Sequence, residues 1–206
     1  MKEINDLNKN ITELKKAVIP KQFINKVDLN SSSIKLTIKN AITVTFVCIY
    51  EANLNLKLND PLVRTEVPDM KIMYQFVHDA IQELVNDFND VCVIKDFGSD
   101  ASVCFNMVEQ KYNLMESVSE AIDFCFQLFD YCAENQVKVR CGMSYDILAY
   151  AGMISTNRLS FDYYGESRKI SAKLAWISKP FTILFDDNMI DFVPDDYRRK
   201  MEQIVI

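Results

Sequence analysis

The sequence predicts an α/β fold, an α+β sandwich in which helices pack on a mixed β-sheet. Hydrophobic residues make up 49% of the 206 residues, which is enough for one sizeable core. Strand-like and helical segments follow one another in the order strand, helix, hairpin, helix, strand, strand, helix, strand, helix. The hairpin within this order excludes a purely parallel sheet.

The first 20 residues are predicted to form a helix ahead of a single domain over residues 21–206. Pro20 ends this helix. Apolar residues recur at alternating steps of three and four, as in two heptads of a coiled coil, at Ile4, Leu7, Ile11, Leu14 and Val18. Two heptads are too short to be stable alone. Two interpretations therefore remain open: a helix that lies on its own domain, and a short coiled coil that forms a dimer.

The first half of the domain is predicted to hold a buried strand, a helix and a hairpin. Residues 41–50 are β-branched and almost continuously apolar, which is typical of a central strand. Residues 53–68 are polar and indicate a long loop. Apolar residues then return at helical spacing over residues 69–89. Short strands at 91–95 and 101–105 flank a turn rich in Asp, Gly and Ser, which predicts the hairpin.

The second half repeats this alternation of strands and amphipathic helices. Helices are predicted over residues 117–135, 165–178 and 186–201. Strands are predicted over residues 137–143, 149–154 and 181–185.

Composition excludes several classes of function. The net charge of −6 disfavours a nucleic-acid-binding protein, which usually presents a basic face. The longest apolar run, residues 41–50, is too short to span a membrane, and the charged start of the chain is not a signal peptide. We expect a cytoplasmic chain, or the soluble part of a larger protein. The six cysteines form no CxxC pair, and His78 is the only histidine, so buried reduced thiols are expected rather than a zinc site.

Four segments, in order and with similar spacing, resemble a known enzyme family. They read ITVTFVCI (42–49), IKDFGSDASVCF (94–105), VRCGMSYD (139–146) and AGMISTNRLSFDYYGESRKISAKL (151–174). The corresponding segments of class III nucleotidyl cyclase catalytic domains read VTVLFADI, IKTIGDGFMAVF, VRIGIHTG and AGVIGTRRLQYDVWGDTVNLAARL. The resemblance covers about residues 19–204 and implies a ferredoxin-like mixed sheet. Family domains usually continue beyond the last helix into a strand hairpin, and we expect that hairpin either to be absent or to lie outside the given sequence.

The resemblance implies that the metal-binding positions have changed. Cyclases use two aspartates to hold the two metal ions that activate the ribose 3′ oxygen and neutralise the phosphates. These positions are Cys48 and Ser99 here, and neither residue offers the carboxylate oxygens that magnesium prefers. Glu51 and Asp100 are displaced acidic candidates. We expect no cofactor, and Mg or Mn only if these acids rebuild the site.

The residues that act on the transition state also differ, whereas those that read the purine are present. The family's Asn and Arg fall at Lys169 and Lys173, which keep positive charge but lose the amide and the bidentate guanidinium fork. Two interpretations of this lysine pair remain open: an anion site with Arg168 nearby, and an exposed basic helix face. The adenine-reading Lys and Asp of adenylyl cyclases align with Lys95 and Asp162, which favours adenine over guanine. The alternative is that Lys95 and Asp162 pair with each other at a subunit groove.

These comparisons favour a catalytically inactive cyclase-homology domain, a pseudo-cyclase. It would act as a dimerising regulatory or scaffolding subunit, as a homodimer or with another cyclase-like chain, and would retain weak binding of an adenine nucleotide. The alternative is a divergent active adenylyl cyclase that converts ATP to cyclic AMP and pyrophosphate, alone or as half of a heterodimer. A third interpretation is an unrelated α/β sandwich that serves as an interaction module, which would lack the ferredoxin-like strand order.

Overall fold

The computed structural model describes residues 2–31, 33–49, 67–88, 90–97, 99–107, 113–153 and 160–201. The elements, in chain order, are α1 (Lys2–Val18), η1 (Lys21–Lys26), β1 (Ile34–Ile49), α2 (Val67–Asp87), β2 (Val91–Phe97), β3 (Asp100–Phe105), α3 (Leu114–Glu134), β4 (Lys138–Met153), β5 (Asp162–Tyr164), α4 (Glu166–Ile177), β6 (Ile183–Phe185), η3 (Asp187–Phe192) and α5 (Asp195–Arg198). None of the helices in these ranges is long and apolar enough to cross a membrane.

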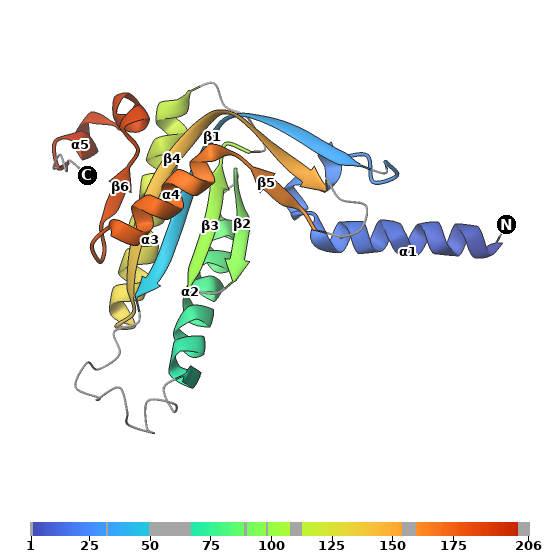
Figure 1. The fold of residues 1–206 in the computed structure, drawn as a ribbon, viewed down its shortest axis with the longest axis horizontal. Coiled ribbons are helices and arrows are strands. Elements are labelled where there is room, and N and C mark those ends of the chain that lie inside the picture. The colour runs from blue at the N-terminus through green and yellow to red at the C-terminus, as the bar shows by residue number, and fades with distance from the viewer. Residues whose placement is uncertain are drawn as a thin grey trace.

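The described strands form one mixed sheet, as the sequence predicts. Their order is β2-β3-β1-β4-β5, with β6 beside β4. The β4–β6 pair is parallel and the other pairs are antiparallel. The run β1-α2-β2-β3-α3-β4 with the spatial order β2-β3-β1-β4 is the ferredoxin-like arrangement, which confirms the predicted fold class. Helices α2 and α3 cover one face of the sheet and α4 lies on the other (Figure 1).

Several element boundaries differ from the prediction, each for a local reason. Strand β1 begins earlier than predicted, at Ile34. The prediction missed residues 34–40 because they alternate between buried and exposed positions, and polar residues at the exposed positions interrupt the apolar run. Strand β4 is continuous and merges two predicted strands. The short strand β5 was not predicted. The prediction of a single final helix over residues 186–201 is wrong, because Pro194 separates the 3-10 helix η3 from the short helix α5. The predicted loop 53–68 lies outside the described residues except for 67–68, which begin α2.

The larger core lies between the sheet and helices α2 and α3. Alternate side chains of β1 enter it, among them Phe46 and Cys48. Phe124 of α3 packs on Phe46, with ring centroids 5.9 Å apart, and meets Phe105 edge-on at 5.5 Å. A smaller core on the α4 side gathers the end of α1, η1, the first half of β1 and the end of β4.

The long strands β1 and β4 bend together along their length (Figure 1), and their pairing is interrupted at Asn40. The φ of Asn40 is 54°, in the left-handed region that asparagine tolerates better than most residues. The side-chain amide of Asn106 donates to the carbonyls of Lys39 and Asn40 and supports the bend. Directly after it, Ala41 pairs with Asp146. The bend therefore fixes where Asp146 stands on β4.

Helix α4 sits very close to the sheet, and small residues allow it. The Thr43 hydroxyl lies 2.7 Å from that of Ser167, and the Thr45 hydroxyl lies 2.8 Å from that of Ser171. All four side chains are buried. At Gly142 of β4, a Cβ would overlap the backbone of Ser171 and Ala175. Paired buried hydroxyls and one glycine thus set the position of α4.

The change Gly142→Ala is expected to lower the free energy of unfolding by about 1–3 kcal/mol, because the new methyl must push the α4 backbone off β4. Denaturant-induced unfolding measures this change. Ala133→Ser adds one atom at an exposed position of α3 and should stay within about 0.5 kcal/mol of wild type. Equal stability of Gly142→Ala and wild type would contradict the close packing described for α4.

Candidate functional site

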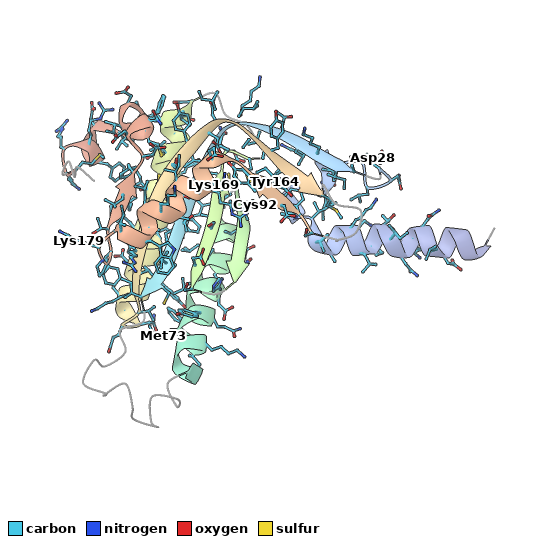
Figure 2. All side chains as sticks on the ribbon, in the orientation of Figure 1. Asp28, Met73, Cys92, Tyr164, Lys169 and Lys179 are labelled. Atoms are coloured by element: carbon cyan, nitrogen blue, oxygen red, sulfur yellow. The ribbon has the colours of Figure 1, made fainter. Side chains whose placement is uncertain are left out.

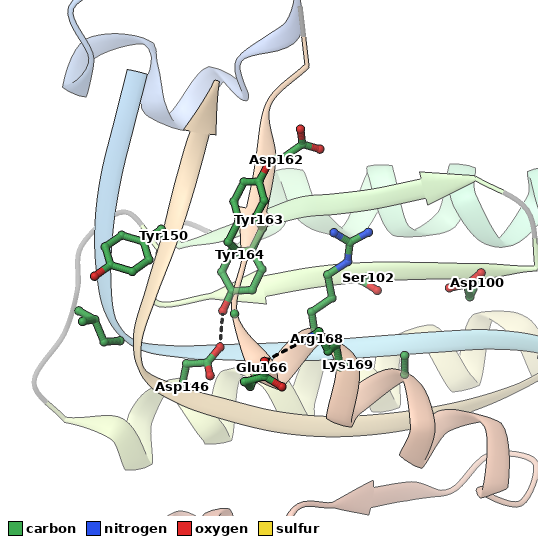
Figure 3. A pocket seen from close by; sticks show the side chains of 13 residues that line it. Asp100, Ser102, Asp146, Tyr150, Asp162, Tyr163, Tyr164, Glu166, Arg168 and Lys169 are labelled. Atoms are coloured by element: carbon green, nitrogen blue, oxygen red, sulfur yellow. Dashed lines mark hydrogen bonds and ion pairs between the residues drawn. The ribbon is translucent and has the colours of Figure 1, made fainter. Parts of the chain in front are cut away.

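A cavity of about 780 Å³ lies between α4, β5 and the sheet (Figure 3). Its size is typical of a small-molecule site. The residues that line it include the carboxylates of Asp100, Asp146, Asp162 and Glu166, the cations Arg168 and Lys169, and the rings of Tyr150, Tyr163 and Tyr164. Figure 2 places Tyr164 and Lys169 on the α4 side of the sheet. The cavity is therefore polar, mixed in charge and partly aromatic.

The carboxylate of Asp146 is the most heavily bonded group of the cavity. The backbone N–H of Ser167 donates to both of its oxygens, at 3.2 and 3.1 Å. The Ser167 hydroxyl donates to Oδ2 at 2.6 Å and the Tyr163 hydroxyl at 3.1 Å. Burial raises the pKa of the Tyr163 phenol, so this hydroxyl keeps its proton and remains a donor. Asp146 thus caps the N-terminus of α4 from a neighbouring strand.

Of the two purine-reading candidates, Asp162 lines the cavity directly. It lies at the start of β5, where it pairs with Gly152 of β4, and Ser160 donates to its Oδ2 at 2.8 Å. Lys95 lies on β2, where it pairs with Ser102 of β3. Ser102 also lines the cavity. Asp162 therefore lines the cavity, and the backbone of Lys95 lies beside a residue that lines it. The side chain of Lys95 is not among those that the structure describes.

The two positions of the family's metal-binding aspartates are neighbours in space. The backbone N–H of Cys48 donates to the carbonyl of Ser99 at 2.9 Å. However, Cys48 points into the larger core, whereas Asp100, which pairs with Val47, lines the cavity on the opposite face of the sheet. Cys48 and Asp100 therefore cannot share one ion. Glu51, the other displaced candidate, lies outside the described residues.

The thiol of Cys48 is poorly suited to bind a metal ion. Burial raises its pKa to about 11, so it is protonated at neutral pH. Metal binding requires the thiolate, and magnesium and manganese prefer oxygen ligands. Among the residues that the structure describes, no three His, Cys, Asp or Glu side chains lie together as a metal site would require. The described residues at these positions do not fit the two-metal site of a cyclase.

Lys169 and Lys173 lie one turn apart on the exposed face of α4. The ammonium of Lys169 bonds the carboxylate of Glu166 at 2.8 Å. This hydrogen bond and the charge of Lys169 lower the pKa of Glu166, and Lys173 adds to the effect. Lys169 lines the cavity beside Glu166 and Arg168 (Figure 3). Positive charge is thus present where the family has Asn and Arg, but one of the two ammonium groups, that of Lys169, is already paired with Glu166.

No protein-family model matches this sequence, and no curated protein sequence matches it. Solved structures do match. The catalytic core of a rhodopsin-guanylyl cyclase with converted specificity, in complex with ATPαS, is 13% identical with a TM-score of 0.59, over 79% of this chain and 85% of that chain. A monomeric double mutant of the guanylyl cyclase domain of the RhoGC fusion protein from the aquatic fungus Blastocladiella emersonii is 14% identical with a TM-score of 0.58, over 77% of this chain and 85% of that chain. The adenylyl cyclase CyaB from P. aeruginosa is 13% identical with a TM-score of 0.55, over 76% and 82%.

These likenesses establish the fold of the chain. It has the fold of the class III nucleotidyl cyclase catalytic domains, as the four sequence segments predict.

Sequence reasoning missed the network around Asp146. The residue aligns with a glycine of the family segment VRIGIHTG, and its main partner, Ser167, is 21 positions away in the chain. No short-range pattern connects the two. The alternation of apolar and polar residues in β4 would at most have placed Asp146 on the α4 face of the sheet.

Buried thiols should make stability fall at high pH. The pKa of Cys48 in the folded state is about 11, above its ordinary value of 9.0. The stability that the neutral buried thiol contributes to the fold is therefore complete below pH 9 and is lost as pH rises to 11. We expect the fall of the unfolding free energy between pH 9 and 11 to be shallower in Cys48→Ala. Val139→Ala, which truncates the buried residue opposite Cys48, should give a curve parallel to wild type. A Cys48→Ala curve parallel to wild type would disprove the assigned shift.

Proposed function

We propose that this chain is a catalytically silent cyclase-homology domain that binds an adenine compound weakly and acts by dimerising, as a regulatory or scaffolding subunit. One observation carries the proposal. The cyclase fold and a cavity beside Asp162 are present, while the two metal positions hold a buried thiol, Cys48, and a serine, Ser99. A fold and a cavity support binding, but this residue set does not support metal-assisted chemistry.

The absence of carboxylates at the metal positions weighs against turnover. Cyclisation needs a charge clamp on the triphosphate and an activated 3′ oxygen, both of which two metal ions supply. Cys48 is protonated and faces the core, and Asp100 faces the other side of the sheet. Lys169, where the family has its ribose-orienting Asn, is already paired with Glu166. Positive charge alone on α4 cannot replace the in-line alignment that catalysis requires.

Binding of adenine is supported by Asp162. A carboxylate accepts a hydrogen bond from the exocyclic amino group of adenine, whereas guanine presents a carbonyl oxygen at the same ring position. Within the described residues, the hydroxyl of Ser160 donates to one oxygen of Asp162, Oδ2, at 2.8 Å. One matched structure holds ATPαS, which shows that this fold can enclose an adenine nucleotide in that protein. We propose that this chain likewise prefers adenine to guanine.

Dimerisation is supported by α1. This helix extends away from the body of the molecule (Figure 1), and Leu7, Ile11 and Leu14 are 60%, 40% and 52% exposed. Val18, at its end, packs on the smaller core, and Lys15 anchors the helix through bonds of 2.8 Å to the carbonyls of Leu29 and Ser31. Ile at the first and Leu at the fourth heptad position favour parallel two-stranded coiled coils. The exposed stripe therefore fits a second helix of the same kind, from another copy or from a related cyclase-like chain.

Purified chain incubated with ATP and either Mg or Mn is expected to form no cyclic AMP above a protein-free control. The physical reason is the loss of carboxylate ligands at both metal positions. Product is measured by chromatography with mass detection. Metal-dependent turnover by wild type that disappears in Asp100→Asn would overturn the proposal and establish the divergent active cyclase instead.

Light scattering after size exclusion should give the mass of two chains for wild type. Leu14→Lys places a charge in the exposed stripe of α1 and should shift the population to one chain, since the lysine must be desolvated at a helix pair. Thr12→Lys adds the same charge to another side of α1 and should leave the dimer intact. A wild-type monomer at all concentrations, or a Leu14→Lys dimer as stable as wild type, would contradict self-association through α1.

A further inference from the structure

The geometry points to Arg168 as the residue that holds a phosphate group in the cavity, so that the cavity takes an adenine nucleotide without a metal ion. The inference rests on the proposed binding of adenine and names the residue that fixes the other end of the same ligand. It is carried by the position of Arg168 on α4 and by the state of its guanidinium, which no group of the described residues accepts from.

Arg168 lies on the side of α4 that faces the cavity. The buried hydroxyls of Ser167 and Ser171 point to the sheet, where they meet hydroxyls of β1. One residue further in each turn, Arg168 and Ala172 share the adjacent face of the helix and line the cavity. Ala172 contributes only a methyl group to this wall. Figure 3 shows the Arg168 side chain extending from α4 into the space that Ser102 also borders.

The guanidinium of Arg168 is available to a ligand. Within the described residues, no carboxylate or carbonyl accepts a hydrogen bond from it, and only the backbone oxygen of Arg168 takes part in a bond. Its neighbour in the cavity wall, Lys169, is instead paired with Glu166 at 2.8 Å, and Arg198 of α5 donates to the carbonyl of Val193 at 3.1 Å. A guanidinium carries five N–H donors, and Arg168 is half-buried beside the cavity, so a bound molecule can satisfy donors that the protein does not.

A phosphate group suits this guanidinium. The planar fork of an arginine donates two parallel N–H bonds to two phosphate oxygens, and such charge-assisted pairs are stronger than neutral hydrogen bonds. Arg168 also belongs to the first turn of α4, a helix of 12 residues whose positive end favours an anion. Because the proposed ligand already carries adenine, the anionic group attached to it in a nucleotide is a phosphate.

One continuous segment supplies the contacts to both ends of the nucleotide. Asp162 begins β5, Arg168 lies in the first turn of α4, and both line the cavity. In adenosine 5′-monophosphate the base and the phosphate lie at opposite ends of the ribose, so Asp162 can accept from the adenine amino group while Arg168 donates to the phosphate. Tyr164, which lies between them in the sequence and also lines the cavity, offers a ring face for contact. This phosphate contact needs no divalent ion, which agrees with the thiol of Cys48 and the hydroxyl of Ser99 at the family's metal positions.

The test compares adenosine, adenosine 5′-monophosphate and inorganic phosphate by isothermal titration of the wild-type chain, in EDTA and at low ionic strength. We expect the monophosphate to bind at least about tenfold more tightly than adenosine, because it adds hydrogen bonds to a charged group. Inorganic phosphate should bind more weakly than the monophosphate, since it lacks the base.

Three results would count against the inference, and they can be told apart. A monophosphate that binds no more tightly than adenosine would overturn the inference and leave the proposed adenine binding intact. Inorganic phosphate that binds as tightly as the monophosphate would show an anion site that does not recognise a nucleotide. No binding of adenosine or of the monophosphate would overturn the proposed adenine binding together with the inference.

Variants of Arg168 test its role directly. Arg168→Ala should remove most of the advantage of the monophosphate and leave the affinity for adenosine at the wild-type value, which also shows that the variant is folded. Arg168→Lys keeps the charge but loses the planar fork, so it should retain only part of the advantage. Arg199→Ala is the matched control, because it removes an exposed arginine that does not line the cavity, and its ratio of affinities should equal that of wild type. A full monophosphate advantage in Arg168→Ala would refute the role of Arg168.

Discussion

The close docking of α4 onto β1 and β4 is the constraint on which the rest of the site depends. Two pairs of buried hydroxyls, Thr43 with Ser167 and Thr45 with Ser171, replace the apolar contacts that usually hold a helix on a sheet. Gly142 removes the one side chain that would keep the backbones apart. Because buried hydroxyls are costly unless paired, the helix has one satisfactory position along the strands. That position brings its first turn over the carboxylate of Asp146 and forms one wall of the cavity.

The residues that hold this cyclase fold together are separate from those at the family's metal positions. The packing of α4 depends on Gly142, Ser171 and Ala175, none of which takes part in metal binding. Cys48 fits the larger core as a small apolar residue does, and its raised pKa keeps it neutral there. The sheet, the helix positions and the cavity are therefore held by residues other than those at the two metal positions of the family.

Much of the fold was predictable because its signals are local. The uninterrupted apolar run of β1, the amphipathic stripes of α2 and α3 and the turn between β2 and β3 each lie within a few residues. The first seven residues of β1 were missed because a half-exposed strand carries polar residues, and the last predicted helix failed because Pro194 divides it. At the site, the alignment located Asp162, Cys48 and Ser99. It could not locate Asp146, whose partners come from β5 and α4 and meet it only in the folded chain.

We propose that the cyclase fold of this chain carries no divalent metal site. The most direct measurement is anomalous scattering from crystals of the chain grown with Mn and ATP. The account predicts no manganese peak within bonding distance of Cys48, Ser99 or Asp100. A peak coordinated by Asp100, with or without Glu51, would show a rebuilt metal site and contradict the account.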